Sequence, residues 1–258
     1  MPDDDFYSCR QSKPAGVGRS LVLHAAHRPC PVFLPAEYQP KYPYPWVLLL
    51  HPHGSDVWET FARVPHLSNR NYIVLCPRGS RKIAVNSYGQ IQWGWAEEGP
   101  ADIHYLQNLL QIARQRWNTP TPRLYVIGVG HAAVVAERFV ASCDQAVAGL
   151  ALLHPTPEDV HKDRLARCVP WGIQLFLGAE LQPRLSRSTL RCLASRYRHK
   201  GASVHQETYS SGSSWYLTGL RRVNRWIMDT MPTTFTLMSP PTAFAGEPPT
   251  TLSDGSIQ

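Results

Sequence analysis

The sequence has no apolar run long enough to cross a bilayer, and its start does not look like a secretory signal. A membrane-spanning helix needs about 20 consecutive apolar residues, whereas the longest apolar run, Ala146 to Leu153, is only long enough for a strand. The first residues, Met-Pro-Asp-Asp-Asp, are acidic and lack the basic and then apolar pattern of a signal peptide. We therefore expect no membrane association and a cytoplasmic location.

The chain also lacks closely spaced cysteines. Its six cysteines show neither a C-x-x-C pair nor the spacing of a metal site. Reduced thiols, some of them buried, fit this scatter and a cytosolic location. The sequence thus predicts no disulfide framework, no metal and no other cofactor. The cysteines are Cys9, Cys30, Cys76, Cys143, Cys168 and Cys192.

Charged residues make up only 17% of the chain, and hydrophobic residues make up 43%, as in a globular protein. The net charge is nevertheless +7, and several arginines gather in residues 184–200. A basic face of this kind can attract nucleic acid or anionic lipid, but a solvated helix face accounts for the same residues. Because no known nucleic-acid motif accompanies the charge, we expect no nucleic-acid partner.

The length of 258 residues fits one large domain with irregular ends. Residues 1–17 have no apolar period and are predicted to form a loose arm. Residues 232–258 are rich in proline, threonine and serine, a composition typical of a disordered tail. The folded domain is therefore placed at residues 18–231.

Within this domain, strand-like and helix-like segments alternate. Strands are predicted at residues 21–23, 31–34, 45–50, 72–76, 123–127, 146–153, 172–177 and 203–208. Helices are predicted at residues 57–69, 100–117, 132–142, 157–167, 184–200 and 216–228, and residues 83–94 are predicted to form a loop. Such alternation is typical of an α/β fold with a mainly parallel central sheet and helices on both faces.

One segment carries the strongest functional signal. Gly128-Val129-Gly130-His131-Ala132 follows a strand and precedes a helix, which is the context of the G-x-S-x-G nucleophile elbow. Gly130 occupies the place of the serine in that motif. Since glycine adopts strained backbone conformations at little steric cost, this replacement is consistent with relief of strain after loss of catalysis.

The order of elements over about residues 19–230 resembles the α/β-hydrolases, specifically the small serine esterases of the phospholipase/carboxylesterase and polyhydroxybutyrate-depolymerase-like groups. The resemblance rests on the elbow, on Leu48-Leu49-Leu50-His51-Pro52-His53-Gly54-Ser55, on Cys76-Pro77-Arg78-Gly79 and on Trp93-Gly94-Trp95. It implies an oxyanion loop at Gly54 and Ser55, oxyanion-binding amides at Ser55 and His131, and a pocket lined by Trp93 and Trp95.

The same resemblance implies that the catalytic triad is incomplete. Besides Gly130, Leu181 falls at the position of the acid, so that only the neighbouring Glu180 can replace it. The loop from Tyr209 to Trp215 has serines where the family has its histidine. Ordinary serine hydrolysis, which needs a serine, a histidine and a carboxylate, is therefore not expected.

Four histidines follow predicted strands or lie in the elbow: His51, His53, His131 and His154. They are expected near the C-terminal edge of the sheet, where open α/β sheets bind ligands. Such a cluster can act as a base or hold a metal, and it can equally consist of hydrogen-bonded, pocket-lining side chains. No metal spacing is present. Cys76 ends a strand at the same edge and is predicted to be a packed thiol.

Three functions remain open from the sequence. The first is a catalytically impaired hydrolase homologue that binds a small ester-like or acyl ligand or a protein partner. The alternative is an active hydrolase with a rewired site, in which His131, His53 or His154 serves as base. A third is an arginine-mediated binder of anionic polymers through residues 184–200. The oligomeric state is not predicted.

Overall fold

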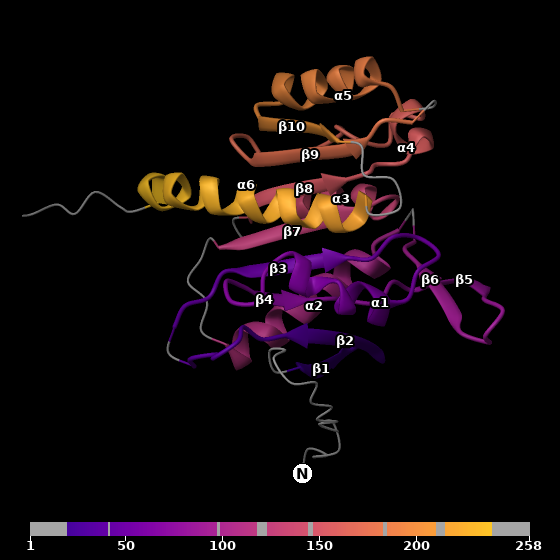
Figure 1. The fold of residues 1–258 in the computed structure, drawn as a ribbon, viewed down its shortest axis with the longest axis vertical. Coiled ribbons are helices and arrows are strands. Elements are labelled where there is room, and N and C mark those ends of the chain that lie inside the picture. The colour runs from indigo at the N-terminus through magenta and orange to yellow at the C-terminus, as the bar shows by residue number, and fades with distance from the viewer. Residues whose placement is uncertain are drawn as a thin grey trace, which may run out of the picture.

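A computed structural model describes residues 20–40, 42–96, 99–117, 123–143, 147–182, 185–209 and 215–238. The predicted arm, residues 1–17, and residues 239–258 of the predicted tail lie outside these ranges. The described chain forms an α/β fold in which one large sheet lies between two layers of helices (Figure 1).

In the described residues, eight strands form the large sheet in the order β1-β2-β4-β3-β7-β8-β9-β10. The strands from β4 to β10 in this order run parallel, and β1 and β2 form an antiparallel edge. This confirms the predicted fold class. The strands are β1 (Ser20–Ala25), β2 (Arg28–Phe33), β3 (Trp46–Leu50), β4 (Ile73–Leu75), β7 (Leu124–Val129), β8 (Val147–Leu153), β9 (Gln174–Glu180) and β10 (Ser203–Tyr209).

The helices cover the two faces of the sheet because alternate side chains of each strand point to opposite faces. On β3, Leu48 and Leu50 pack in the core under α2, α3 and α5, whereas Val47 and Leu49 pack under α1 and α6. Figure 1 shows α1 and α6 in front of the sheet. The helices are α1 (Val57–Ala62), the 3₁₀ helix η1 (Val64–His66), α2 (Ala101–Arg116), α3 (Ala132–Ala141), α4 (Pro157–His161), α5 (Arg187–His199) and α6 (Trp215–Met238).

Residues 83–94, predicted as a loop, belong instead to a hairpin of β5 (Arg81–Val85) and β6 (Ile91–Gly94), which projects from the body (Figure 1). The Asn86 side-chain oxygen accepts hydrogen bonds from the backbone N–H groups of Tyr88 and Gln90 and so builds the turn. Because most of its side chains are exposed, the hairpin has no apolar period that would reveal it in the sequence.

Three helices end at other places than predicted. The helix predicted at 57–69 is broken at Arg63 into α1 and η1, and Pro65 lies within η1, in line with the interruption expected from this proline. The helix predicted at 157–167 ends at His161, since Asp163 and Ala166 adopt left-handed conformations with φ of 51° and 57°. The helix predicted at 216–228 extends to Met238.

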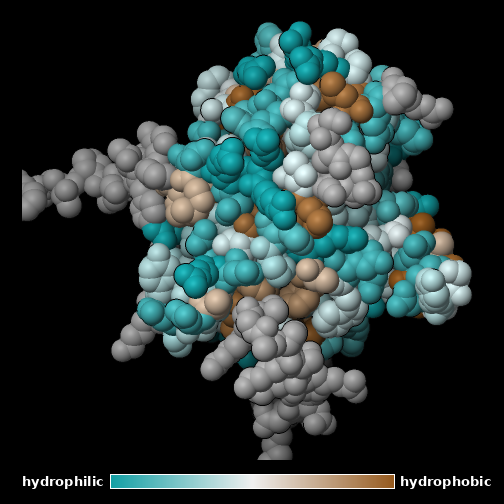
Figure 2. Space-filling model, viewed as in Figure 1, coloured by the Kyte–Doolittle hydropathy of each residue, from teal (hydrophilic) through white to brown (hydrophobic). Residues whose placement is uncertain are grey.

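No described helix combines the length and the apolar character needed to cross a membrane. On the face shown in Figure 2, hydrophobic residues occur as scattered spots among hydrophilic ones. Isolated apolar residues of this kind are normal for protein surfaces.

Candidate functional site

The predicted elbow is present as a strand, a sharp turn and a helix. Strand β7 ends at Val129, Gly130 turns the chain with φ of +60°, and α3 begins at Ala132. The Gly130 N–H donates to the Leu153 carbonyl of the neighbouring strand β8, at 2.8 Å. The turn therefore projects at the C-terminal edge of the parallel strands, where this fold class binds ligands.

A side chain at Gly130 would meet little resistance from its neighbours. A Cβ built there approaches only Pro52 within 4 Å, at 3.8 Å from the Pro52 Cβ, which is an ordinary contact. Gly128 differs, because a Cβ there would lie 2.7 Å from the Ala132 oxygen and from the Ala136 Cβ. Glycine is thus needed at Gly128 for close packing of α3, whereas at Gly130 only the positive φ favours it.

His131, at the start of α3, forms a pair with a carboxylate. Its Nδ1 lies 2.8 Å from the Asp159 Oδ2, and both side chains are buried. Asp159 is held in turn by Thr156, whose hydroxyl donates to the same Oδ2 at 2.5 Å, and by Arg164, whose Nη1 lies 3.5 Å from Oδ1. The carboxylate therefore fixes the orientation of the His131 ring, as the acid does in a histidine-dependent catalytic site.

The environment of Asp159 favours its charged form. Burial by itself raises the pKa of the carboxyl, but the hydrogen bonds from His131 and Thr156 and the charge of Arg164 outweigh burial and lower the pKa below its ordinary value. Asp159 is consequently a carboxylate at neutral pH. It was not predicted from the sequence, in which Thr156-Pro157-Glu158-Asp159 has only the pattern of a helix start.

A cavity of about 600 Å³ opens beside this pair. His131 and His53 line one side, with their rings nearly perpendicular at a centroid distance of 5.3 Å. Side chains of α4 and its flanks line the other, and they make the wall mainly basic: Thr156, Pro157, Glu158, His161, Lys162 and Arg164. The cavity thus joins two of the predicted histidines to residues that sequence reasoning did not find.

The predicted oxyanion loop is hydrogen-bonded to the hairpin. The Gly54 N–H donates to the Trp93 carbonyl at 2.9 Å, and the Trp93 N–H donates to the Ser55 carbonyl at 3.0 Å. The Ser55 N–H, predicted to bind an oxyanion, donates to the Pro52 carbonyl at 3.3 Å. The Ser55 hydroxyl donates to the Glu59 Oε2 at 3.1 Å. In this conformation both the amide and the hydroxyl of Ser55 have partners within the protein.

The two tryptophans predicted to line a pocket have other contacts. Trp95 is completely buried, and its Nε1 donates to the His51 carbonyl at 2.9 Å. Trp93 is half-buried and lies under the Arg78 guanidinium, whose carbon is 4.0 Å from the ring centroid. Neither tryptophan is among the described residues that line the cavity.

His51 is a structural histidine. Its Nδ1 lies 2.9 Å from the Pro52 carbonyl oxygen, and its Nε2 accepts a hydrogen bond from the Gly79 N–H at 3.0 Å. Nδ1 therefore carries the proton of the neutral ring. Burial lowers the pKa of His51 to about 4, which keeps the ring neutral at physiological pH.

His154 and Glu180 form a separate group with Tyr209 at the ends of β8, β9 and β10. The Glu180 N–H donates to the His154 Nδ1 at 3.3 Å, so the ring proton lies on Nε2, 2.7 Å from the Tyr209 hydroxyl oxygen. Burial lowers the pKa of His154 to about 4. Its backbone has φ of 50°, a conformation that costs energy in a non-glycine residue. The histidine at the elbow is His131, and the carboxylate with which it pairs is that of Asp159.

Three further features were considered in the sequence: Cys76, a possible metal site and the loop with serines in place of the triad histidine. Cys76 is completely buried, and burial raises the pKa of its thiol, which makes it a poor nucleophile. In the described ranges, no three His, Cys, Asp or Glu side chains gather in a way that could hold a metal ion. Of the loop that has serines in place of the triad histidine, residues 210–214 lie outside the described residues.

Comparison of the sequence with known families found no family that matches, and comparison with curated proteins found no relative. The structure, however, is similar to solved esterases. A carboxylesterase from Mesorhizobium loti has a TM-score of 0.60 and 18% identity over 81% of this chain and 98% of its own. The fold is that of an α/β-hydrolase.

Two further structures agree. Esterase 2 of Thermogutta terrifontis, solved after phosphorylation by paraoxon, has a TM-score of 0.59 and 9% identity over 81% of this chain and 94% of its own. The Bacillus cereus carboxylesterase has a TM-score of 0.54 and 18% identity over 80% of this chain and 95% of its own. At these identities the likeness establishes the α/β-hydrolase fold and no more.

Proposed function

We propose that this chain is an esterase-fold protein that does not perform ordinary serine hydrolysis and that binds a small ester-like or acyl ligand in the cavity beside the elbow. The observation that carries the proposal is Gly130, which occupies the turn between β7 and α3 where this fold presents its nucleophile. A glycine there offers no hydroxyl for attack on a carbonyl carbon. The cytoplasmic location stays a prediction.

The neighbouring hydroxyl groups support this proposal. Ser55 donates to Glu59, Thr156 donates to Asp159, and Ser80 donates to the Asp102 Oδ2 at 3.1 Å. In the described structure each of these three hydroxyls thus donates to a carboxylate, whereas a serine nucleophile donates to a histidine base. The amide of Ser55, which donates to Pro52, is likewise directed within the protein.

The cavity supports the ligand class. Its volume of about 600 Å³ is in the range of small-molecule sites, which is about 300 to 1,000 Å³. Lys162 and Arg164 on its wall lie beside the carboxylates of Glu158 and Asp159, so the site offers hydrogen-bond donors to the oxygens of an ester or acyl group without a large excess of positive charge.

Esterase assays and active-site labelling test the proposal. Purified protein incubated with short-chain p-nitrophenyl esters should hydrolyse them no faster than the Gly54→Ala or His131→Gln variants do, and a fluorophosphonate probe should not label it. A small serine esterase treated in parallel verifies the reagents. Rapid turnover together with fluorophosphonate labelling would overturn the proposal.

One observation favours a second function, hydrolysis with His131 as general base. With the Nδ1 proton of His131 donated to Asp159, the basic lone pair of the neutral ring lies on Nε2. In this reaction Nε2 accepts a proton from water, the resulting hydroxide attacks the ester carbonyl carbon, and the imidazolium returns the proton to the departing alkoxide. Water replaces the missing serine, so no covalent intermediate forms.

The two functions predict different results with the same variants. A water-based hydrolase turns over esters without fluorophosphonate labelling and loses that activity in His131→Gln and Asp159→Asn. His66→Gln, at a half-buried residue of η1 that does not line the cavity, is the matched control. Ester hydrolysis that is unchanged in His131→Gln would exclude this second function.

A further inference from the structure

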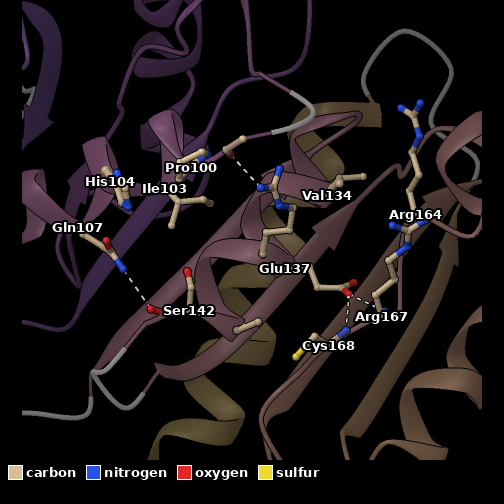
Figure 3. A pocket seen from close by; sticks show the side chains of 13 residues that line it. Pro100, Ile103, His104, Gln107, Val134, Glu137, Ser142, Arg164, Arg167 and Cys168 are labelled. Carbon is tan, nitrogen blue, oxygen red and sulfur yellow. Dashed lines mark hydrogen bonds between the residues drawn. The ribbon is translucent and has the colours of Figure 1, made fainter.

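A second cavity, of about 730 Å³, lies between α2, α3 and the segment that follows α4 (Figure 3). It is distinct from the cavity beside the elbow, and Arg164 is the one described residue that lines both. Nothing in the resemblance to esterases or in the proposed function assigns a role to it.

Side chains one helical turn apart build the cavity from α2 and α3. Ile103 and Gln107 are contributed by α2, and Val134 and Arg138 by α3, so each pair lies on one face of its helix. Ile103 and Val134 are almost completely buried and form the apolar floor of the cavity, and Ala141 adds an exposed apolar side chain.

Hydrogen bonds join the two helices at both ends of this groove. The Arg138 Nη2 donates to the Gly99 carbonyl at 2.8 Å, and the Gln107 Nε2 donates to the Ser142 carbonyl at 3.1 Å (Figure 3). The groove between α2 and α3 is therefore a fixed feature of the fold, because both of its helices are anchored to each other.

The charge of the cavity is positive. Arg138, Arg164 and Arg167 line it, and among the described lining residues Glu137 is the one acidic side chain. The Glu137 carboxylate is directed at the segment after α4 (Figure 3). Its oxygens accept hydrogen bonds from the backbone N–H groups of Ala166, Arg167 and Cys168 and from the Tyr197 hydroxyl. The carboxylate is thus occupied in holding this segment. Because Arg164 is paired with Asp159, the positive field in the cavity comes mainly from Arg138 and Arg167.

We propose that this cavity binds an organic phosphate, a phosphate monoester that carries a short apolar group. Guanidinium groups bind phosphate through paired, charge-assisted hydrogen bonds, and the two of Arg138 and Arg167 suit a doubly charged phosphate better than a singly charged carboxylate. A volume of about 730 Å³ is too large for inorganic phosphate alone. The apolar lining, which includes Ile103, Val134 and the exposed Ala141, suits a short alkyl or acyl chain attached to the phosphate.

Titration calorimetry with hexyl phosphate, inorganic phosphate and 1-hexanol tests the site. Hexyl phosphate is expected to bind at least about tenfold more tightly than either of the others, since it alone has both the charge and the chain. The double variant Arg138→Gln/Arg167→Gln is expected to weaken its binding at least about tenfold. Ala141→Trp, an exposed position of α3 that lines the cavity, should block binding without removing any of these hydrogen bonds.

Two variants serve as matched controls. Arg191→Gln removes an exposed arginine of α5 outside the cavity, and Lys162→Gln removes a cation of the elbow cavity. Both should keep the wild-type affinity for hexyl phosphate. The proposal would be overturned if the protein did not bind hexyl phosphate at millimolar concentration. It would also be overturned if the double variant and Ala141→Trp both bound hexyl phosphate with wild-type affinity, or if Arg191→Gln lost as much affinity as the double variant. Weaker binding of hexyl phosphate in Lys162→Gln alone would overturn the proposal too, because it would place the ligand in the elbow cavity.

Discussion

The His131 Nδ1 lies 2.8 Å from the Asp159 Oδ2, which joins the residue after the elbow glycine to the first turn of α4. Both side chains are buried, and the Asp159 side chain has no exposed area. The pair therefore holds the wall of the elbow cavity against the turn where the fold normally carries its nucleophile. The pair ties α4 to the elbow, and it fixes the orientation of the His131 ring.

Asp159→Asn should destabilise the protein at neutral pH. The amide cannot accept from His131 and Thr156 as strongly as a carboxylate does, and it leaves Arg164 without its negative partner. We expect a loss of about 2 to 3 kcal/mol in the free energy of unfolding, measured by urea denaturation. Glu158→Gln, at the exposed neighbouring side chain, should change this free energy by less than about 0.5 kcal/mol. Equal effects of the two variants would contradict the prediction.

The same pair gives a pH dependence of known sign. Because the pKa of Asp159 is lower in the folded protein than in the unfolded chain, its contribution is fully present above the unfolded value, about 3.9, and is lost as the pH falls through the folded value. The difference in unfolding free energy between wild type and Asp159→Asn should accordingly be retained at pH 5 and shrink toward pH 3. A difference that grows on acidification would be the opposite result.

Gly130→Ser should fold and remain inactive. The space at this position admits a side chain, and the cost comes from φ of +60°, which we expect to be about 1 to 2 kcal/mol. Gly89→Ser, in the hairpin turn with φ of +76° and no atom within 4 Å of a built Cβ, is a control with similar strain. Similar losses of stability in both variants, with no fluorophosphonate labelling, are the expected outcome. Labelling of Gly130→Ser would show that a competent base already faces the elbow.

The sequence was sufficient to predict the strands that are buried on both faces. Trp46–Leu50 and Val147–Leu153 are continuous apolar runs, and such runs have few other interpretations in a chain that alternates strands and helices. The elbow was predictable for a similar reason, because β7 must carry a glycine at Gly128, where α3 packs closely on the strand.

Tertiary contacts determined what the sequence did not predict. Asp159 looks like a residue of a helix start in the sequence, and only the tertiary fold brings it to His131 at the start of α3, 28 residues away. The strand predicted at residues 172–177 ends at Glu180 instead, because parallel pairing with β10 extends β9 to this residue. The hairpin escaped detection because its strands bury little, and hydrophobic periodicity is the main signal of a strand.

Acid should destabilise the protein through two neutral histidines. The pKa values of His51 and His154 are both lowered to about 4 by burial, from the ordinary 6.5. Between these values the unfolded chain binds protons that the folded protein does not, so the free energy of unfolding falls as the pH drops from 6.5 to 4. The slope is at most about 1.4 kcal/mol per pH unit for each histidine.

Urea denaturation at several pH values checks this with two variants. His154→Gln should reduce the slope, because the titrating ring is removed. Tyr209→Phe removes the hydroxyl partner of Nε2 but keeps the ring, and should therefore retain the slope while lowering stability. An unchanged slope in His154→Gln would show that this histidine does not titrate with unfolding.

Glu137→Gln should be the most destabilising of these substitutions and should act on one segment. The carboxylate accepts from three backbone N–H groups and the Tyr197 hydroxyl, and a carboxamide would direct its own N–H groups at these donors. We expect a loss of about 3 to 5 kcal/mol in the free energy of unfolding. Tyr197→Phe, which removes one donor and leaves the carboxylate in place, should cost only about 1 to 2 kcal/mol.

Hydrogen exchange shows where the effect of Glu137→Gln lies. The amides of Ala166, Arg167 and Cys168 should lose protection in this variant, since each donates to the carboxylate in the wild type. The amides of β3, which lies in the centre of the sheet, should lose less protection in this variant than the three amides of the segment do. If all three segment amides kept their wild-type protection, the carboxylate would not be what holds the segment that forms the wall of the α2–α3 cavity.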